Sequence, residues 1–152
     1  MKADHSFEKT LCKWVSAISP MLVIEWGPGK STRLIHELAP SARIISIESQ
    51  DQFFLKATQD HKYAKIVLCR IPEYGPSEYS CWPSLREPSS RFDLAFIDGR
   101  QRVSCLVECL SCLSDDGVAI LHDADRKHYQ NGISLFNVID STECTVVLRK
   151  KS

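Results

Sequence analysis

One short stretch of this sequence gathers residues that could do chemistry around a tight turn. Residues 23–32 read VIEWGPGKST, so that Glu25 stands two positions before Gly27 and four before Gly29. Glycine allows sharp backbone turns and lets a ligand approach the chain without meeting a Cβ atom. A carboxylate beside such a turn can accept hydrogen bonds or face a positive charge. The stretch therefore predicts a turn that binds a small molecule.

The end of this stretch, Gly-Lys-Ser-Thr at residues 29–32, matches the end of a phosphate-binding P-loop. The full P-loop pattern also needs a glycine five positions before Gly29, and Ile24 occupies that position. Glu25 would in addition repel the phosphates of a nucleotide. We therefore expect Lys30 to point to solvent, and we expect the turn to hold a ligand other than a polyphosphate.

Further polar residues follow the predicted strands. Glu48 ends one apolar run, Asp98 ends a second, and His122 and Asp123 end a third. In open parallel sheets, ligands bind beyond the carboxyl ends of the strands, where the strand order reverses. Each residue taken singly could cap a helix or occupy a turn. Together they predict one shared site, because an apolar interior offers carboxylates no partners.

The elements that must position these residues alternate between strand and helix. Short apolar runs predict strands, and 3.6-residue periodicity predicts the helices between them. We expect strands at 21–25, 43–48, 64–69, 92–98 and 118–122, a turn at Asp115-Asp116-Gly117, a helix that Asp4 or Ser6 caps and that ends near Ile18, helices at 31–38, 50–61 and 101–113, a short helix after Asp125, and an antiparallel hairpin at 133–139 and 144–149. The pattern predicts an α/β fold over residues 1–152: a single domain, built as a three-layer αβα sandwich on a mostly parallel, Rossmann-like sheet with a C-terminal antiparallel hairpin.

Residues 70–91 break this alternation. The segment is polar and rich in proline, and it includes Tyr74, Tyr79 and Trp82. Long loops in compact domains are usually functional or disordered, and disordered segments are poor in aromatic residues. Two interpretations stay open: a functional loop, or a loop whose aromatic side chains pack it onto the domain.

Composition limits the partners. The 152 residues carry no formal net charge, 43% are hydrophobic and 25% are charged, so nothing attracts nucleic acid or an anionic membrane. Charged residues such as Glu8, Lys9 and Lys13 interrupt the N-terminal segment, so a signal peptide is not expected there. We expect a cytoplasmic protein with a small-molecule substrate. The Trp14 helix or an exposed sheet edge is a candidate contact for a homodimer.

The seven cysteines do not predict a disulfide framework, because their number is odd and no export signal accompanies them. Cys105, Cys109 and Cys112 recur at helical spacing and are expected in the core. A zinc site of paired Cys-x-x-Cys motifs would need a second pair, which the sequence lacks.

Glu-x-Gly-x-Gly after a buried strand, an acidic residue about 20 positions later, and an Asp after the fourth strand together resemble class I S-adenosylmethionine-dependent methyltransferases. The resemblance covers residues 21 to 149 and rests on short motifs. It implies that Glu48 hydrogen-bonds the ribose hydroxyls of the cofactor, and that the turn faces its cationic amino-acid end. The cofactor-binding residues it implies are Glu25, Gly27, Pro28, Gly29, Ser31, Glu48, Ser49 and Asp98.

A closer resemblance, to metal-dependent O-methyltransferases, implies a divalent metal held by Asp98, His122 and Asp123. Such an ion would lower the pKa of a substrate hydroxyl that attacks the methyl group. The sequence departs from that family, because His122 is a poor ligand for magnesium and Gln101 replaces the lysine that the family often uses as base. A metal-free scheme is the rival, with His122 as general base and Arg100 or Arg102 binding an anionic substrate group.

The expected function is therefore S-adenosylmethionine-dependent methyl transfer, with Asp98, His122, Arg100 and Arg102 as catalytic residues and a small polar or acidic acceptor that is methylated on oxygen. A non-catalytic binding module of the same fold is the alternative. A nicotinamide-dependent oxidoreductase is disfavoured, because Thr32 stands where its third glycine would fall.

Overall fold

The computed structural model describes residues 3–142 and 144–152, and side chains from Phe7 onward. Strands and helices alternate along most of the chain, as in other α/β domains. The elements are α1 (Ala3–Ile18), β1 (Leu22–Trp26), α2 (Lys30–Leu38), β2 (Arg43–Glu48), α3 (Asp51–Asp60), β3 (Lys65–Leu68), α4 (Trp82–Arg86), β4 (Phe92–Ile97), α5 (Arg102–Cys112), β5 (Leu113–His122), the 3₁₀ helix η1 (Lys127–Tyr129), α6 (Gln130–Ile133), β6 (Phe136–Ser141) and β7 (Thr145–Lys150).

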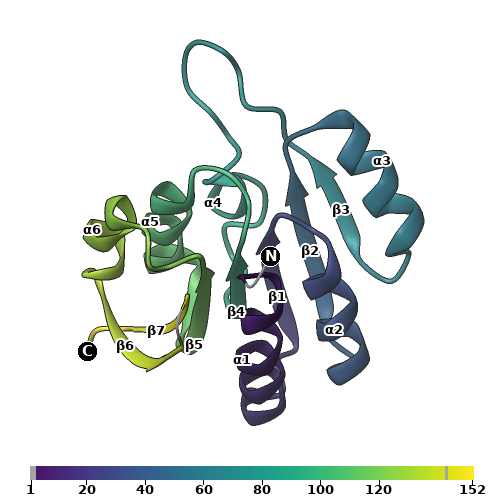
Figure 1. Ribbon diagram of the computed structural model, residues 1–152. Helices are drawn as coiled ribbons and strands as arrows, with labels where there is room; N and C mark the ends of the chain where they lie inside the picture. Colours follow the sequence, from purple (N-terminus) through teal and green to yellow (C-terminus); the bar gives the residue numbers. More distant parts are fainter. Residues whose placement is uncertain (1–2, 143) are drawn as a thin grey trace.

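The strands form one seven-stranded sheet in the order β3-β2-β1-β4-β5-β7-β6, which Figure 1 shows from one side to the other. The five strands from β3 to β5 are parallel, and β7 is antiparallel to both β5 and β6. Strand order reverses between β1 and β4. The carboxyl ends of these two strands therefore flank the position where open α/β sheets bind ligands.

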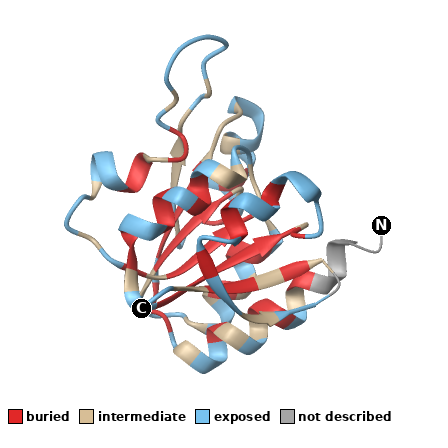
Figure 2. Ribbon diagram, turned by 90° about the vertical axis from the view of Figure 1, so that its left-hand side faces the viewer, coloured by how far each residue is buried: buried red, intermediate tan, exposed pale blue. Residues whose placement is uncertain are grey.

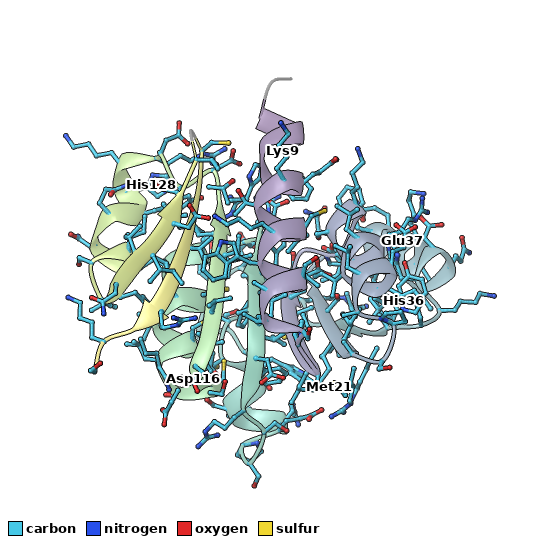
Figure 3. The ribbon with its side chains drawn as sticks, turned by 90° about the horizontal axis from the view of Figure 1, so that it is seen from below. Lys9, Met21, His36, Glu37, Asp116 and His128 are labelled. Atoms are coloured by element: carbon cyan, nitrogen blue, oxygen red, sulfur yellow. The ribbon has the colours of Figure 1, made fainter. Side chains whose placement is uncertain are left out.

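Helices cover both faces of the sheet, as the predicted αβα sandwich requires. Phe7 and Leu11 of α1 and Ile35 of α2 pack on one face, and Leu106 of α5 and Ile133 of α6 pack on the other. Figure 2 shows the strands buried between the helices, whose outer faces are exposed. Seen from below, α1 lies across the sheet, with α2 to one side and the β6–β7 hairpin to the other (Figure 3).

The predicted elements are confirmed, with boundary changes at several of them. The predicted caps Asp4 and Ser6 lie outside the described side chains, and α1 already begins at Ala3. The predicted turn at Asp115-Asp116-Gly117 is wrong, because β5 runs through it from Leu113 to His122. The pairing with β4 shifts register there, between Phe92 and Leu94. A Cβ on Gly117 would lie 2.8 Å from the Phe92 carbonyl oxygen, so glycine serves close strand packing at this bulge rather than a turn.

The 70–91 segment is partly anchored, as the packing interpretation predicts, and the functional interpretation stays a prediction. Tyr74 is 85% exposed at the tip, whereas Tyr79 and Trp82 are buried. Trp26 Nε1 of β1 donates a hydrogen bond of 2.9 Å to the Tyr79 carbonyl oxygen. The short helix α4 follows; the sequence does not predict it, because its five residues are too few to show helical periodicity.

Several cysteine side chains lie in the core, and a tryptophan side chain links α1 to β6. None of the seven cysteines, all of which the structure describes, forms a disulfide, and Cys105, Cys109 and Cys112 are buried on α5 as predicted. Trp14 Nε1 donates a hydrogen bond of 2.8 Å to Asp140 of β6, and the homodimer contact through this helix stays a prediction. Within the described residues, no helix is long and apolar enough to cross a membrane.

Candidate functional site

A cavity of about 710 Å³ opens at the carboxyl ends of β1, β2 and β4. Its volume falls within the range typical of small-molecule sites, and it lies at the predicted reversal of strand order. The residues that line it come from the glycine turn, the end of β2, α3, the segment after β4, and the rim near α6: Gly27, Pro28, Gly29, Glu48, Ser49, Gln50, Phe53, Lys56, Ala57, Asp60, His61, Tyr79, Asp98, Gly99, Arg100, Gln101, Arg102, Arg126 and Tyr129.

Two glycines allow the ends of β1 and β4 to pack closely together beside the cavity. Gly27 has a φ of 92°, and a Cβ there would lie 3.0 Å from the Asp98 backbone. A Cβ on Gly99 would lie 2.1 Å from the Tyr79 hydroxyl oxygen. That hydroxyl accepts a hydrogen bond of 3.1 Å from the Arg100 backbone nitrogen, so Tyr79 braces the segment after β4. The 70–91 segment thus supplies one wall of the cavity.

Glu25 does not face the cavity, contrary to the prediction. Its side chain is fully buried beneath the turn, where it accepts hydrogen bonds from the hydroxyls of Ser31, Thr32 and Ser46. Desolvation raises its pKa from 4.5 to about 7, against the effect of these three hydrogen bonds. Ser31 is buried with it and does not line the cavity either. Glu25 and Ser31 thus link β1, β2 and the start of α2, and they support the turn without lining the cavity.

Glu48 occupies the position predicted for a ribose-binding acid. Its Oε2 accepts hydrogen bonds from the backbone nitrogens of Ser49, at 2.8 Å, and Gln50, at 3.0 Å. These two bonds fix the carboxylate at the end of β2, where the residue lines the cavity. A carboxylate offers about four acceptor sites, two on each oxygen, so Oε2 is fully used by these bonds and Oε1 keeps two sites for the two hydroxyls of a diol.

Arg102 ties together the ends of β4 and β5. Its guanidinium lies 3.3 Å from Asp98 Oδ1 and 3.5 Å from Asp123 Oδ2, and it donates a hydrogen bond of 2.7 Å to the His122 carbonyl oxygen. Its Nε also donates to the Gly99 carbonyl oxygen at 2.9 Å. Its side chain is only 11% exposed. Arg102 therefore acts chiefly as a fixed cation that holds the cavity floor, whereas Arg100 is exposed on the rim.

His122 is not where a general base would act. It is 3% exposed, it does not line the cavity, and its ring packs edge-on against Phe7 of α1 with centroids 5.1 Å apart. Its Nδ1 lies 3.4 Å from the Thr145 hydroxyl, and its Nε2 lies 3.6 Å from Asp123 Oδ1. The predicted catalytic role of His122 therefore has no geometric support.

The predicted metal ligands do not form one set. Among the described residues, the group of potential ligands that includes His122 and Asp123 does not include Asp98. The Arg102 guanidinium contacts both Asp98 and Asp123, so these two carboxylates are bridged by a side chain of the protein. Oxygen-rich magnesium coordination through these three residues does not fit this arrangement.

Several cavity residues were not predicted from the sequence. Tyr79 comes from a segment without periodicity, and Phe53, Ala57 and His61 come from α3 or its end. The prediction examined strand ends, whereas a helix surface gives no comparable sequence signal. Tyr129 also lines the cavity at its rim, and His128 is exposed.

The fold is that of class I S-adenosylmethionine-dependent methyltransferases. A methyltransferase-like protein from Silicibacter pomeroyi superposes with a TM-score of 0.76 at 14% identity, over 99% of this chain and 88% of that one. A methyltransferase from Podospora anserina, solved with SAH, gives 0.73 at 15% identity, over 96% and 78%. An O-methyltransferase from Streptomyces achromogenes involved in tomaymycin synthesis, solved with SAM, gives 0.69 at 14%, over 95% and 80%. No protein-family model and no curated protein matches the sequence.

Proposed function

We propose that this chain binds S-adenosylmethionine and transfers its methyl group to an oxygen atom of a small polar or acidic acceptor. The observation that carries the proposal is Glu48, whose carboxylate two backbone N–H groups fix at the end of β2, on the wall of the cavity. An acid at this position suits the two ribose hydroxyls of a nucleoside. The fold shared with solved SAM-bound methyltransferases supports the same cofactor.

The glycine turn supports the other end of the cofactor. Gly29 lines the cavity, and a Cβ there would meet nothing within 4 Å, so a ligand can approach the backbone N–H and C=O groups of the turn closely. Asp98, on the same wall, provides a carboxylate for the cationic amino acid and sulfonium end. Glu25 contributes indirectly, because its hydrogen bonds hold the residues that follow the turn.

The acceptor would enter from the rim that carries Arg100, Arg126 and Tyr129. Two arginines beside an open cavity favour a carboxylate or phosphate on the acceptor, since a guanidinium binds both in a bidentate manner. The protein would accelerate transfer by holding the acceptor oxygen in line with the methyl carbon and the sulfur. In that step the oxygen lone pair forms the new C–O bond, the C–S bond electrons return to sulfur, and the hydroxyl proton leaves to solvent.

Methyl transfer can be tested with S-[methyl-³H]adenosylmethionine and a panel of hydroxylated carboxylic acids and phenols. The proposal expects label in at least one acidic acceptor, with a KM that rises about 10-fold or more in Arg126→Gln, because a charge-assisted contact of about 1.5 to 3 kcal/mol is lost. Lys127→Gln is the matched control, since it removes a neighbouring exposed cation that does not line the cavity. Transfer only to uncharged acceptors, with no effect of Arg126→Gln, would contradict the acidic-acceptor assignment.

A second candidate function is cofactor binding without transfer. It is favoured by the burial of His122, which removes the predicted base from the cavity. Under this function the labelled cofactor binds and Glu48 variants weaken binding, but no acceptor in the panel takes up label.

A further inference from the structure

We propose that His122, Asp123 and Cys144 form a site for a zinc-type metal ion, distinct from the cavity. One potential ligand atom from each residue lies within 4.8 Å of the other two. None of the three residues lines the cavity. Cys144 was not considered as a ligand from the sequence, because it is 21 positions from Asp123 and no motif connects them.

The fold brings the three residues together at one end of an antiparallel strand pair. His122 is the last residue of β5 and pairs with Thr145, the first residue of β7. The Ala124 nitrogen donates a hydrogen bond of 2.8 Å to the Cys144 carbonyl oxygen, which continues this pairing beyond the strands. Asp123 adopts a left-handed φ of 55°, a conformation that aspartate tolerates better than most residues. The backbone around the site is therefore fixed from both strands.

The distances suit coordination better than hydrogen bonding. His122 Nε2 lies 3.6 Å from Asp123 Oδ1, which is too long for a hydrogen bond. Donors that share a tetrahedral zinc ion at about 2.0–2.2 Å are separated by roughly 3.4 Å. The two side chains would therefore have to move only slightly to bind one ion together. The His122 ring is 3% exposed and held against Phe7, so little side-chain freedom is lost on binding.

The types of ligand select the ion. A thiolate, an imidazole nitrogen and a carboxylate oxygen are the ligands of Zn²⁺, whereas Mg²⁺ prefers six oxygens. Three protein ligands leave a fourth tetrahedral position for water. The second carboxylate oxygen of Asp123 lies 3.5 Å from both Arg102 and Arg126. Such outer contacts orient a ligating carboxylate, as second-shell partners do in other metal sites.

Binding requires the Cys144 thiol to lose its proton to solvent as the zinc–sulfur bond forms. Metal uptake by this site should therefore release a proton and should weaken as the pH falls. No step of the proposed methyl transfer depends on this ion, so the site can be present whether or not the chain is an enzyme.

The test uses metal alone with the full chain, freed of metal and kept reduced. Co²⁺ reports thiolate coordination through a sulfur-to-metal charge-transfer absorption, and Zn²⁺ affinity follows from competition with a chromophoric chelator. We expect one ion per chain, a charge-transfer band with Co²⁺, and a melting temperature that rises with Zn²⁺ concentration, because the ion binds the native state.

Cys144→Ser should abolish the charge-transfer band and weaken Zn²⁺ binding by at least about 10–100-fold, the loss typical of even an outer-shell partner. Asp123→Asn should weaken binding while it keeps the band. Cys12→Ser on α1 is the matched control, because it removes another partly buried thiol outside the group. The proposal is overturned if the wild-type chain gives no band, if Cys144→Ser keeps it, or if Cys12→Ser removes it. Circular dichroism of each variant confirms that the fold is intact.

Discussion

Replacement of Glu25 with glutamine should change how the stability of the fold depends on pH. Complete burial disfavours the charged carboxylate, and the charge of Asp98 acts in the same direction. Hydrogen bonds from Ser31, Thr32 and Ser46 favour the charged form. Desolvation is the larger effect, so the pKa of Glu25 rises from 4.5 to about 7. Glutamine keeps the shape of the side chain and one acceptor oxygen, replaces the other oxygen with an NH₂ donor, and cannot titrate.

The sign follows from proton binding. Between pH 4.5 and about 7 the folded chain holds a proton on Glu25 that the unfolded chain has lost, so stability falls as the pH rises through this range. One pKa unit is worth about 1.4 kcal/mol, so the whole difference corresponds to about 3 kcal/mol. Most of this loss of stability occurs between pH 5 and pH 8. The wild type should therefore lose about 2–3 kcal/mol relative to Glu25→Gln over that range.

Urea unfolding at half-unit steps of pH measures both chains, and their difference cancels the groups that the substitution leaves unchanged. Glu87→Gln is the control of opposite sign. Hydrogen bonds and charge from Arg43 lower the pKa of Glu87, so its contribution to stability is present at neutral pH and is lost as the pH falls. The stability of Glu87→Gln should therefore approach that of the wild type as the pH falls, and not as it rises.

A constant difference between the wild type and Glu25→Gln from pH 5 to pH 8 would refute this reasoning. A difference that favours the wild type increasingly at high pH would refute it more strongly. It would mean that the three hydroxyl donors outweigh desolvation and that Glu25 is charged in the folded protein.

Two further predictions concern the cavity walls. Gly99→Ala should destabilise the fold by about 1–3 kcal/mol in urea unfolding, because its Cβ would lie 2.1 Å from the Tyr79 hydroxyl, and Tyr79→Phe should restore part of that loss in the double variant. Arg102→Met should cost about 3–5 kcal/mol in the same assay, because Asp98 and Asp123 lose their shared cation; a cost below about 1 kcal/mol would show that the two carboxylates do not need it.

Much of the fold could be predicted because its signals are local. Buried parallel strands read as short apolar runs, and these located β1, β2 and β4 to within a residue or so. The start of β5 was misplaced, because Asp115, Asp116 and Gly117 are typical turn residues. In the structure they lie in a bulge of β5, because the pairing with β4 passes from Phe92–Leu113 to Leu94–Val118, and such pairing leaves no mark in the local sequence.

The site was predicted less completely, and for a physical reason. Position at a strand end fixes where a residue lies but not which way its side chain points, since successive residues in a strand face opposite sides. Glu48 and Asp98 line the cavity. The Glu25 side chain, by contrast, is buried under the glycine turn, and the His122 side chain packs against α1. Arg102 was expected to bind substrate, but its guanidinium contacts two carboxylates and three carbonyl groups of the protein itself.

Calorimetric titration with S-adenosylmethionine and, separately, with NAD tests the central claim most directly, with Glu48→Ala as the variant and Glu73→Ala as a surface control. The wild type and Glu73→Ala should bind one S-adenosylmethionine per chain and no NAD. Glu48→Ala should bind the cofactor about 10-fold or more weakly, because two charge-assisted hydrogen bonds to ribose are lost. No heat with S-adenosylmethionine, or equal affinity in Glu48→Ala, would contradict the assignment of this cavity.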